Sequence, residues 1–277
     1  MSRSMIGYIP NDTFFHRLTG SSKLLCFLFI SVVGMISYDT RFLLGLGILS
    51  IILFKISKIK WQDVSFIVNF MLFFSVLNLV TVYLFAPEYG GILYGSRTVI
   101  LDGIGRYTLT QEQLFYEFNL LLKYICTIPL ALIFLITTNP SEFAASLNRL
   151  GVSYKISYAV SLALRYIPDV QNDFRTIAQA QQARGVELSK KAKLTERVKG
   201  HIQIAIPLIF SSLERITVIS NAMELRRFGK EKKRTWYSAK PMKKADFLVI
   251  GVTIFIVLIG IGLFYMNSGR FYNPFQE

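Results

Sequence analysis

Two stretches decide the fold: residues 156–185, ISYAVSLALRYIPDVQNDFRTIAQAQQARG, and residues 202–229, IQIAIPLIFSSLERITVISNAMELRRFG. In each stretch, apolar side chains recur at alternating intervals of four and three residues, which lines them up along one ridge of an α-helix. We call these ridge residues the seam; they are Ile156, Val160, Ala163, Ile167, Val170, Phe174, Ile177, Ile202, Ile206, Ile209, Leu213, Ile216 and Met223. The spacing predicts two helices of ~25–30 residues, or roughly 40 Å each. The simplest interpretation is a pair of amphipathic helices in a protein core.

Prolines and glycines predict where these helices bend and end. Pro168 and Pro207 each follow a seam residue, and each is expected to kink or start its helix because proline donates no backbone hydrogen bond. Gly185 and Gly229 are the predicted helix stops, since glycine adopts the left-handed C-cap conformation without steric cost.

Arginines lie at both predicted ends, in Ala183-Arg184-Gly185 and in Leu225-Arg226-Arg227. A cation in the last turn stabilises the negative end of a helix, and that role is sufficient for a lone arginine. Two arginines at equivalent ends of two similar helices instead favour a shared docking role.

Charge and hydropathy place the chain in a membrane. Hydrophobic residues make up 52% of the 277 residues, and the mean hydropathy is +0.44. Residues 139–244 contain 20 Lys and Arg against 8 Asp and Glu, an excess of 12 in a chain of net charge +14. Because this basic module lies between apolar runs, the positive-inside rule explains it more simply than nucleic-acid binding does. We therefore expect the module at the cytoplasmic face of the cell membrane, near anionic headgroups.

The sequence predicts an all-α integral membrane protein with about five transmembrane helices and a cytoplasmic-side module of long amphipathic helices. Residues 1–138 form the predicted N-terminal transmembrane region, with apolar runs at 24–38, 42–54, 64–86 and 118–137. Residues 139–244 form the basic module, and 245–277 form the last transmembrane helix and a short tail. The expected N-terminus is cytoplasmic and the expected C-terminus is external.

The motifs of enzymes and self-powered carriers are missing from the sequence. It contains no Gly-x-x-x-x-Gly-Lys-Ser/Thr loop, no His-Glu-x-x-His or Cys-x-x-Cys metal site and no Gly-x-Ser-x-Gly elbow. The apolar runs hold almost no carboxylates of the kind that ion-coupled carriers need at membrane depth. We expect no catalytic residue, no metal site and no cofactor, and we interpret Cys26 and Cys126 as small buried hydrophobic residues.

Several short motifs, taken in their order and spacing over nearly the whole chain, resemble one family. They are the two arginine ends, Tyr8–Lys23, Thr138–Glu142, Leu147–Val152 and Leu164–Pro168. In these the chain resembles the transmembrane (T) component of energy-coupling factor transporters, the EcfT/CbiQ-like family. The second arginine end departs from the family pattern, because Leu225 and Arg227 stand where small residues are usual.

The resemblance implies a non-catalytic energy-coupling subunit of an ATP-driven micronutrient importer. It implies that two ABC-type ATPase subunits dock on the basic module and that a membrane-embedded substrate-binding (S) subunit contacts this chain. The residues implied in ATPase docking are Ala183, Arg184, Gly185, Leu225, Arg226 and Arg227. The seam would contact the S subunit, or its two halves would contact each other. The cargo would be a vitamin or a transition-metal ion, as in the cobalamin and cobalt systems of the family.

Two other classes of function remain open at this point. One is a membrane scaffold or assembly protein whose basic helices bind an acidic partner or anionic lipid. The other is an integral-membrane enzyme acting on a lipid. Copurification with two nucleotide-binding subunits would favour the transporter subunit over both.

Overall fold

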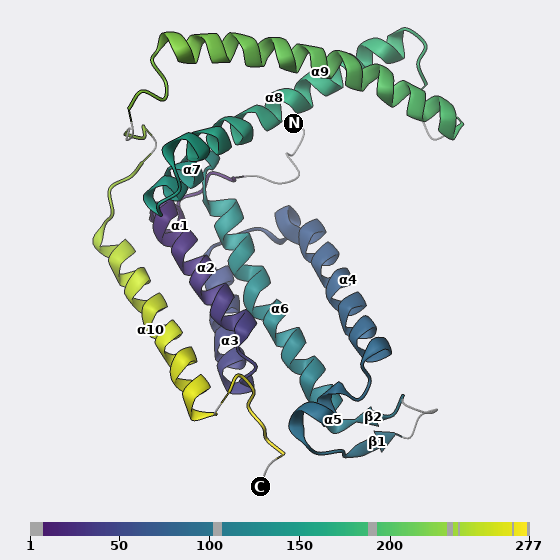
Figure 1. Ribbon diagram of the computed structural model, residues 1–277, viewed down its shortest axis with the longest axis vertical. Helices are drawn as coiled ribbons and strands as arrows, with labels where there is room; N and C mark the ends of the chain where they lie inside the picture. The colour runs from purple at the N-terminus through teal and green to yellow at the C-terminus, as the bar shows by residue number, and fades with distance from the viewer. Residues whose placement is uncertain are drawn as a thin grey trace. The chain divides into compact units, whose positions relative to one another are not determined.

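The computed structural model describes residues 8–101, 107–187, 193–231, 235–237, 239–267 and 269–275, and their regular secondary structure is almost entirely α-helical (Figure 1). The helices are α1 (Phe14–Arg17), α2 (Gly20–Ile36), α3 (Thr40–Ile56), α4 (Trp61–Phe85), α5 (Tyr89–Tyr94), α6 (Gln111–Thr137), α7 (Pro140–Arg149), α8 (Tyr154–Ala183), α9 (Leu194–Leu225) and α10 (Lys244–Met266). One small antiparallel sheet pairs β1 (Val99–Leu101) with β2 (Leu109–Thr110). The chain divides into two compact units, residues 1–139 with 240–277 and residues 140–239, and each is described by itself.

Four of the described helices are long and apolar enough to cross a membrane: α4, α6, α10 and residues 195–225 of α9. This confirms the prediction of an all-α integral membrane protein. The presence of α9 among these candidate membrane helices differs from the sequence prediction, which assigns this segment to the cytoplasmic-side module. It meets the same criterion as α10 because it carries apolar side chains outside the seam, among them Ile204, Phe210 and Val218.

The first two apolar helices are shorter than a full membrane span. The predicted run 42–54 lies within α3, and the predicted run 24–38 extends two residues past the end of α2 at Ile36; each helix has 17 residues. Such a helix is about 25 Å long at 1.5 Å per residue, whereas the hydrocarbon core of a bilayer is about 30 Å thick.

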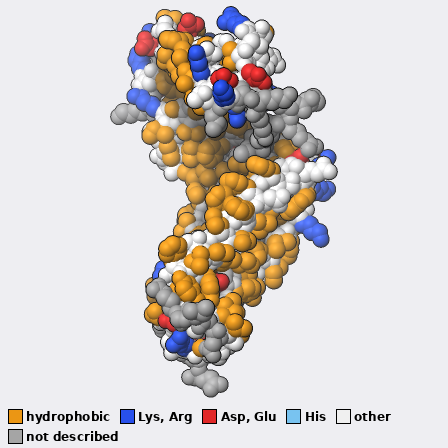
Figure 2. Space-filling view, turned by 90° about the vertical axis from the view of Figure 1, so that its right-hand side faces the viewer, with side chains coloured by type: hydrophobic (Ala, Val, Ile, Leu, Met, Phe, Trp, Pro, Cys, Tyr) orange, Lys and Arg blue, Asp and Glu red, His pale blue; other side chains and the backbone are white. Residues whose placement is uncertain are grey.

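The outer surface of the first unit is apolar, as expected for helices that face lipid. On α4 only Val64 and Ser75 are buried, while phenylalanines such as Phe66 and Phe73 are more than 60% exposed. Figure 2 shows hydrophobic side chains over most of one face of the long helices. A helix that is apolar all round satisfies its backbone internally and can stand directly against lipid tails.

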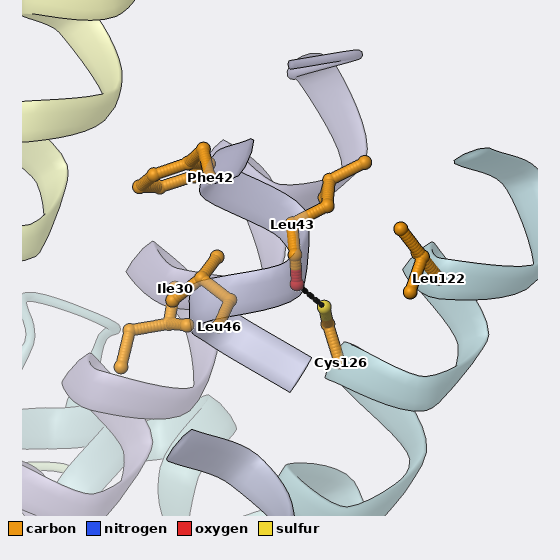
Figure 3. Close-up of a cluster of buried hydrophobic side chains, with 6 residues drawn as sticks. All are labelled: Ile30, Phe42, Leu43, Leu46, Leu122 and Cys126. Atoms are coloured by element: carbon orange, nitrogen blue, oxygen red, sulfur yellow. Dashed lines mark hydrogen bonds between the residues drawn. The ribbon is translucent and has the colours of Figure 1, made fainter. Parts of the chain in front are cut away.

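The core of the first unit lies where α2 and α3 both pack against α6. Figure 3 shows its buried side chains, Ile30, Phe42, Leu43, Leu46, Leu122 and Cys126. The Cys126 thiol donates to the Leu43 carbonyl at 3.1 Å, and it therefore packs as the small buried residue that the sequence predicts. On α10, Gly260 is required by a close approach to α2, because an added Cβ would lie 2.6 Å from the Val33 side chain.

A buried carboxylate ties the start of α10 to the start of α2. Asp246 is 0% exposed, and its Oδ1 accepts from the Thr19 backbone N–H at 2.8 Å, the Thr19 hydroxyl at 3.0 Å and the Ser22 hydroxyl at 2.5 Å. Its Oδ2 accepts from the Lys243 backbone N–H at 2.8 Å. A buried charge is tolerated only when it is hydrogen-bonded in this way. The network therefore fixes α2 against α10 across more than 220 residues of sequence.

Asp39 starts α3 by capping its N-terminus. Its side chain accepts from the backbone N–H groups of Arg41 and Phe42 and from Asn267 Nδ2, the last at 2.7 Å. Burial raises the pKa of this carboxyl, but the hydrogen bonds from Arg41, Asn267 and Phe42 together outweigh it and hold the pKa below its ordinary value of 3.8. Asp39 is therefore ionised at neutral pH, and it links the α2–α3 turn to the end of α10.

The C-terminal tail, which the sequence analysis describes only as short, packs against other parts of the first unit. Tyr38 and Phe271 form a parallel β-bridge, and their rings stack with centroids 4.6 Å apart. Asn273 Nδ2 donates to the Tyr94 carbonyl at 2.9 Å. The tail thus joins the α2–α3 turn to α5.

The second unit consists of α7, α8 and α9, and its two long helices cross (Figure 1). α8 has 30 residues and α9 has 32, and Pro168 and Pro207 lie inside them rather than at their starts. After α9 the chain returns to the beginning of α8, where Phe228 packs on Tyr158 with ring centroids 4.6 Å apart. Trp236 continues this contact by donating from Nε1 to Asn148 Oδ1 at 3.1 Å.

Candidate functional site: two arginine-bearing helix ends

The first arginine end is a regular C-terminal helix cap. α8 ends at Ala183, and Arg184 is the C-cap residue. Gly185 has φ +88°, and its N–H donates to the Gln182 carbonyl at 2.9 Å, while the Val186 N–H donates to the Gln181 carbonyl at 3.0 Å. These two bonds define the Schellman motif, with glycine in the left-handed position just after the cap. The predicted stop at Gly185 is confirmed.

The second arginine end has the same geometry with a different residue in the left-handed position. α9 ends at Leu225, and Arg226 is the C-cap residue. The Arg227 N–H donates to the Glu224 carbonyl at 2.8 Å, and the Phe228 N–H donates to the Met223 carbonyl at 2.9 Å. Arg227 has φ +54°, which is uncommon for a residue other than glycine.

The predicted stop at Gly229 is therefore wrong. Gly229 does have a positive φ of +88°, but it lies two residues beyond the left-handed residue that closes α9. Sequence reasoning assigned the stop to the nearest glycine, whereas the backbone hydrogen bonds close the helix at Arg227. The three positions of one end consequently match the three positions of the other: Ala183 with Leu225, Arg184 with Arg226, and Gly185 with Arg227.

Substituting the left-handed residue at each helix end is expected to stabilise one end and to destabilise the other. Arg227→Gly should stabilise the end of α9 by ~1 kcal/mol, and Gly185→Ala should destabilise the end of α8 by a similar ~1 kcal/mol, because only glycine adopts this conformation without strain. No atom lies within 4 Å of a Cβ added at Gly185, so its cost would be conformational alone.

Amide hydrogen exchange, measured for each variant over the last turns of both α8 and α9, reports these effects. Each variant is the control for the other, since each leaves one helix end unchanged. Unaltered exchange at the end of α9 in Arg227→Gly would contradict the assignment of Arg227 to the strained position.

All six residues of the two arginine ends are exposed: Ala183, Arg184, Gly185, Leu225, Arg226 and Arg227. Leu225 is 86% exposed, an unusual position for a leucine at a helix end. Together the two ends offer guanidinium groups, a small-residue surface and an apolar side chain for contact with another molecule.

The seam does not bury itself within this chain. Of its thirteen residues none is buried, and Ile156, Ile209 and Ile216 are more than half exposed. On α9 the fully buried apolar residue is Ile204, which lies off the seam. Within the described residues the two halves of the seam therefore do not form a closed interface with each other.

Sequence reasoning missed the side chains that join the two long helices. Arg215 on α9 forms an ion pair with Asp173 on α8, with Nη2 and Oδ2 2.6 Å apart. The signal was available: the residues of this pair are 42 positions apart, the same separation as Arg184 and Arg226. Opposite charges at matching positions of two repeated helices indicate such a contact.

These features define the class: a multi-pass α-helical membrane protein with a pair of crossed helices that end in equivalent, exposed arginines. The CbiQ family model, described as cobalt transport protein, matches residues 11–237. The chain belongs to this family, whose members include the transmembrane (T) components of energy-coupling factor transporters.

Relatives that carry the name of that component match almost end to end. The energy-coupling factor transporter transmembrane protein EcfT of Streptococcus thermophilus is 28% identical over 97% of this chain and 100% of its own length. The protein of that name from Streptococcus equi is 27% identical over 97% and 98% of the two chains. The one from Bacillus selenitireducens is 29% identical over 88% and 91%.

Proposed function

We propose that this chain transmits the motion of two ABC-type ATPase subunits to a membrane-embedded substrate-binding subunit, and so drives the import of a micronutrient. The observation that carries the proposal is the pair of geometrically equivalent arginine ends. Two equivalent docking structures are expected to bind two similar partner subunits, and a pair of ATPase subunits fits this requirement. The relatives named as energy-coupling factor transporter proteins support this choice of partner.

In this proposal Arg184 and Arg226 each enter a groove of one ATPase and bind a carboxylate there. A guanidinium group donates two parallel hydrogen bonds to a carboxylate, which gives direction as well as charge attraction. Small Ala183 and Gly185 allow a close approach on one side, and exposed Leu225 adds an apolar contact on the other. Closure of the ATPases around ATP would then displace both helix ends together.

The exposed seam is the proposed contact surface for the substrate-binding subunit. Its residues lie unburied along two helices of 30 and 32 residues, long enough to carry displacement from the arginine ends to a partner in the bilayer. A partner that covers these side chains gains roughly 25 cal/mol for each Å² of apolar surface removed from water. Because α9 is itself apolar enough to enter a membrane, we place this contact at the bilayer surface.

The proposed side of the membrane and the class of cargo follow from charge and family. The basic excess of residues 139–244 favours the cytoplasm, where the ATPases find ATP. The family description as cobalt transport protein favours a transition-metal ion, with a vitamin as the second proposed class of cargo. In either case the substrate-binding subunit, rather than this chain, would select the cargo.

Affinity purification of the tagged chain, coexpressed with the ATPase and substrate-binding subunits of its own transporter, tests the proposal. We expect two nucleotide-binding subunits for each copy of this chain, with ATP hydrolysis and cargo uptake after reconstitution into vesicles. The chain purified alone should hydrolyse no ATP. A stable complex with an acidic protein and no nucleotide-binding subunit would contradict the proposal and favour a membrane scaffold.

A further inference from the structure

Arg215 makes the densest polar contact between the two long helices of the second unit. Its Nη2 lies 2.6 Å from Asp173 Oδ2, its Nη1 lies 3.8 Å from Asp169 Oδ2, and its guanidinium carbon lies 5.9 Å from the centroid of the Tyr166 ring. Positions 166, 169 and 173 share one face of α8, since residues three and four apart are neighbours on a helix. A single side chain of α9 therefore spans two turns of α8.

The contact lies at equal distances from the two arginine ends. Asp173 lies eleven residues before Arg184, and Arg215 lies eleven residues before Arg226. At 1.5 Å per residue, each helix extends about 16 Å from this contact to its arginine. The ion pair thus joins matching positions of two equivalent helices.

The helices run in opposite directions past this contact. Gln181, late in α8, donates to the carbonyl of Gln203, early in α9, at 3.4 Å. Phe228, just after α9, packs on Tyr158, early in α8. Because the two helices run in opposite directions, their arginine ends lie on opposite sides of Arg215, like two arms of equal length about one pivot.

We propose that Arg215, held by Asp173 and Asp169, is the positioning residue that fixes how the two helices cross and so sets the separation of the arginine ends. This inference rests on the proposed function. The side chains of Arg215 and Asp173 are about one-third exposed, so the pair is partly shielded from competing water. An arginine across two carboxylates resists both sliding and rotation of one helix on the other, whereas a lysine offers a single point charge.

A distance measurement on the purified chain, without its partners, tests the pivot directly. Spin labels at the exposed, matching positions 180 and 222 report the separation of the arms, with Cys26 and Cys126 replaced by serine. Arg215→Gln or Asp173→Asn should broaden and shift the distance distribution. The exchange Arg215→Asp with Asp173→Arg should restore it, and Lys199→Gln, which removes a charge elsewhere on α9, should leave it unchanged.

The assembled transporter supplies the second readout. In Arg215→Gln we expect the ATPases still to bind and hydrolyse ATP while uptake for each ATP hydrolysed falls by about fivefold or more, a common size for coupling between sites. The charge exchange should recover most of that loss, which general destabilisation would not. If Arg215→Gln cannot be purified, Asp173→Asn and the charge exchange carry the same comparison.

The two readouts separate this inference from the proposed function. An unchanged distance distribution in both single variants overturns the pivot, whatever the transporter does. Distances that respond as expected in a chain that binds no ATPase overturn the proposed function and leave the pivot standing as a structural result.

Discussion

Reversing the charge at both arginine ends, Arg184→Glu with Arg226→Glu, is expected to abolish uptake and to release the ATPases from the complex. Each carboxylate on the ATPase would face another carboxylate in place of a guanidinium group. Truncating one partner of a buried charge pair at an interface typically costs ~2–5 kcal/mol, and reversal adds repulsion. Two such losses total ~4–10 kcal/mol, which lowers the affinity by roughly a thousandfold or more.

Single charge reversals and a conservative Arg→Lys change should reduce ATPase binding and uptake to different degrees. Arg184→Glu alone should abolish uptake, because motion of one helix end without the other does not displace the crossed pair as a whole. Arg184→Lys keeps the charge and loses the fork of parallel donors, so it should retain the ATPases more weakly than the parent does. Copurified ATPase and reconstituted uptake are measured for each variant.

A matched control distinguishes docking from general effects of charge. Lys199→Glu reverses an exposed charge on α9 away from its arginine end and should leave both measurements unchanged. If the arginines act only on their own helix dipoles, each substitution lowers stability by ~0.3–1 kcal/mol and the complex remains intact. A double variant that copurifies with full ATPase activity and normal uptake would end the docking proposal.

Asp246→Ala is expected to cause the largest loss of stability in the first unit, ~2–4 kcal/mol, because it leaves the Thr19 and Lys243 backbone N–H groups without their acceptor and removes one partner from each of the Thr19 and Ser22 hydroxyls. These donors are buried or partly buried at the contact between α2 and α10. Asp246→Asn keeps an acceptor oxygen for the bonds now made to Oδ1 but places its NH2 group against the Lys243 N–H, so it should recover only part of the loss. Thermal unfolding of the purified chain in detergent measures the change.

Asp63 provides the matched control, because it occupies the same third position of α4 that Asp246 occupies in α10. The Asp63 carboxylate also interacts favourably with the positive N-terminal end of its helix, but its side chain makes no hydrogen bond to any other described residue. Asp63→Ala should therefore cost only ~0.3–1 kcal/mol. Equal losses in the two variants would show that Asp246 acts through the helix dipole and not through its network.

The sequence was informative wherever the physical cause is local. The four-and-three spacing predicted both long helices, and apolar runs predicted membrane helices, because periodicity and hydropathy depend on neighbouring residues. Both arginine ends were located from the residues around them. The mistaken stop at Gly229 arose because glycine is the cheapest left-handed residue but not the only one, and Arg227 adopts that conformation.

By itself, the sequence determined that this protein is an α-helical integral membrane protein with two similar basic helices that end in arginine. The tertiary structure decided which side chains join the parts: Asp246 with Thr19, Tyr38 with Phe271, and Arg215 with Asp173. Each of these contacts links residues from 42 to more than 220 positions apart, so no pattern among neighbouring residues encodes them, and only the Arg215–Asp173 pair has a signal in the 42-residue repeat. They form only when helices pack, because packing brings side chains from distant parts of the chain into contact, and a buried polar group such as Asp246 must then find its partner on another element.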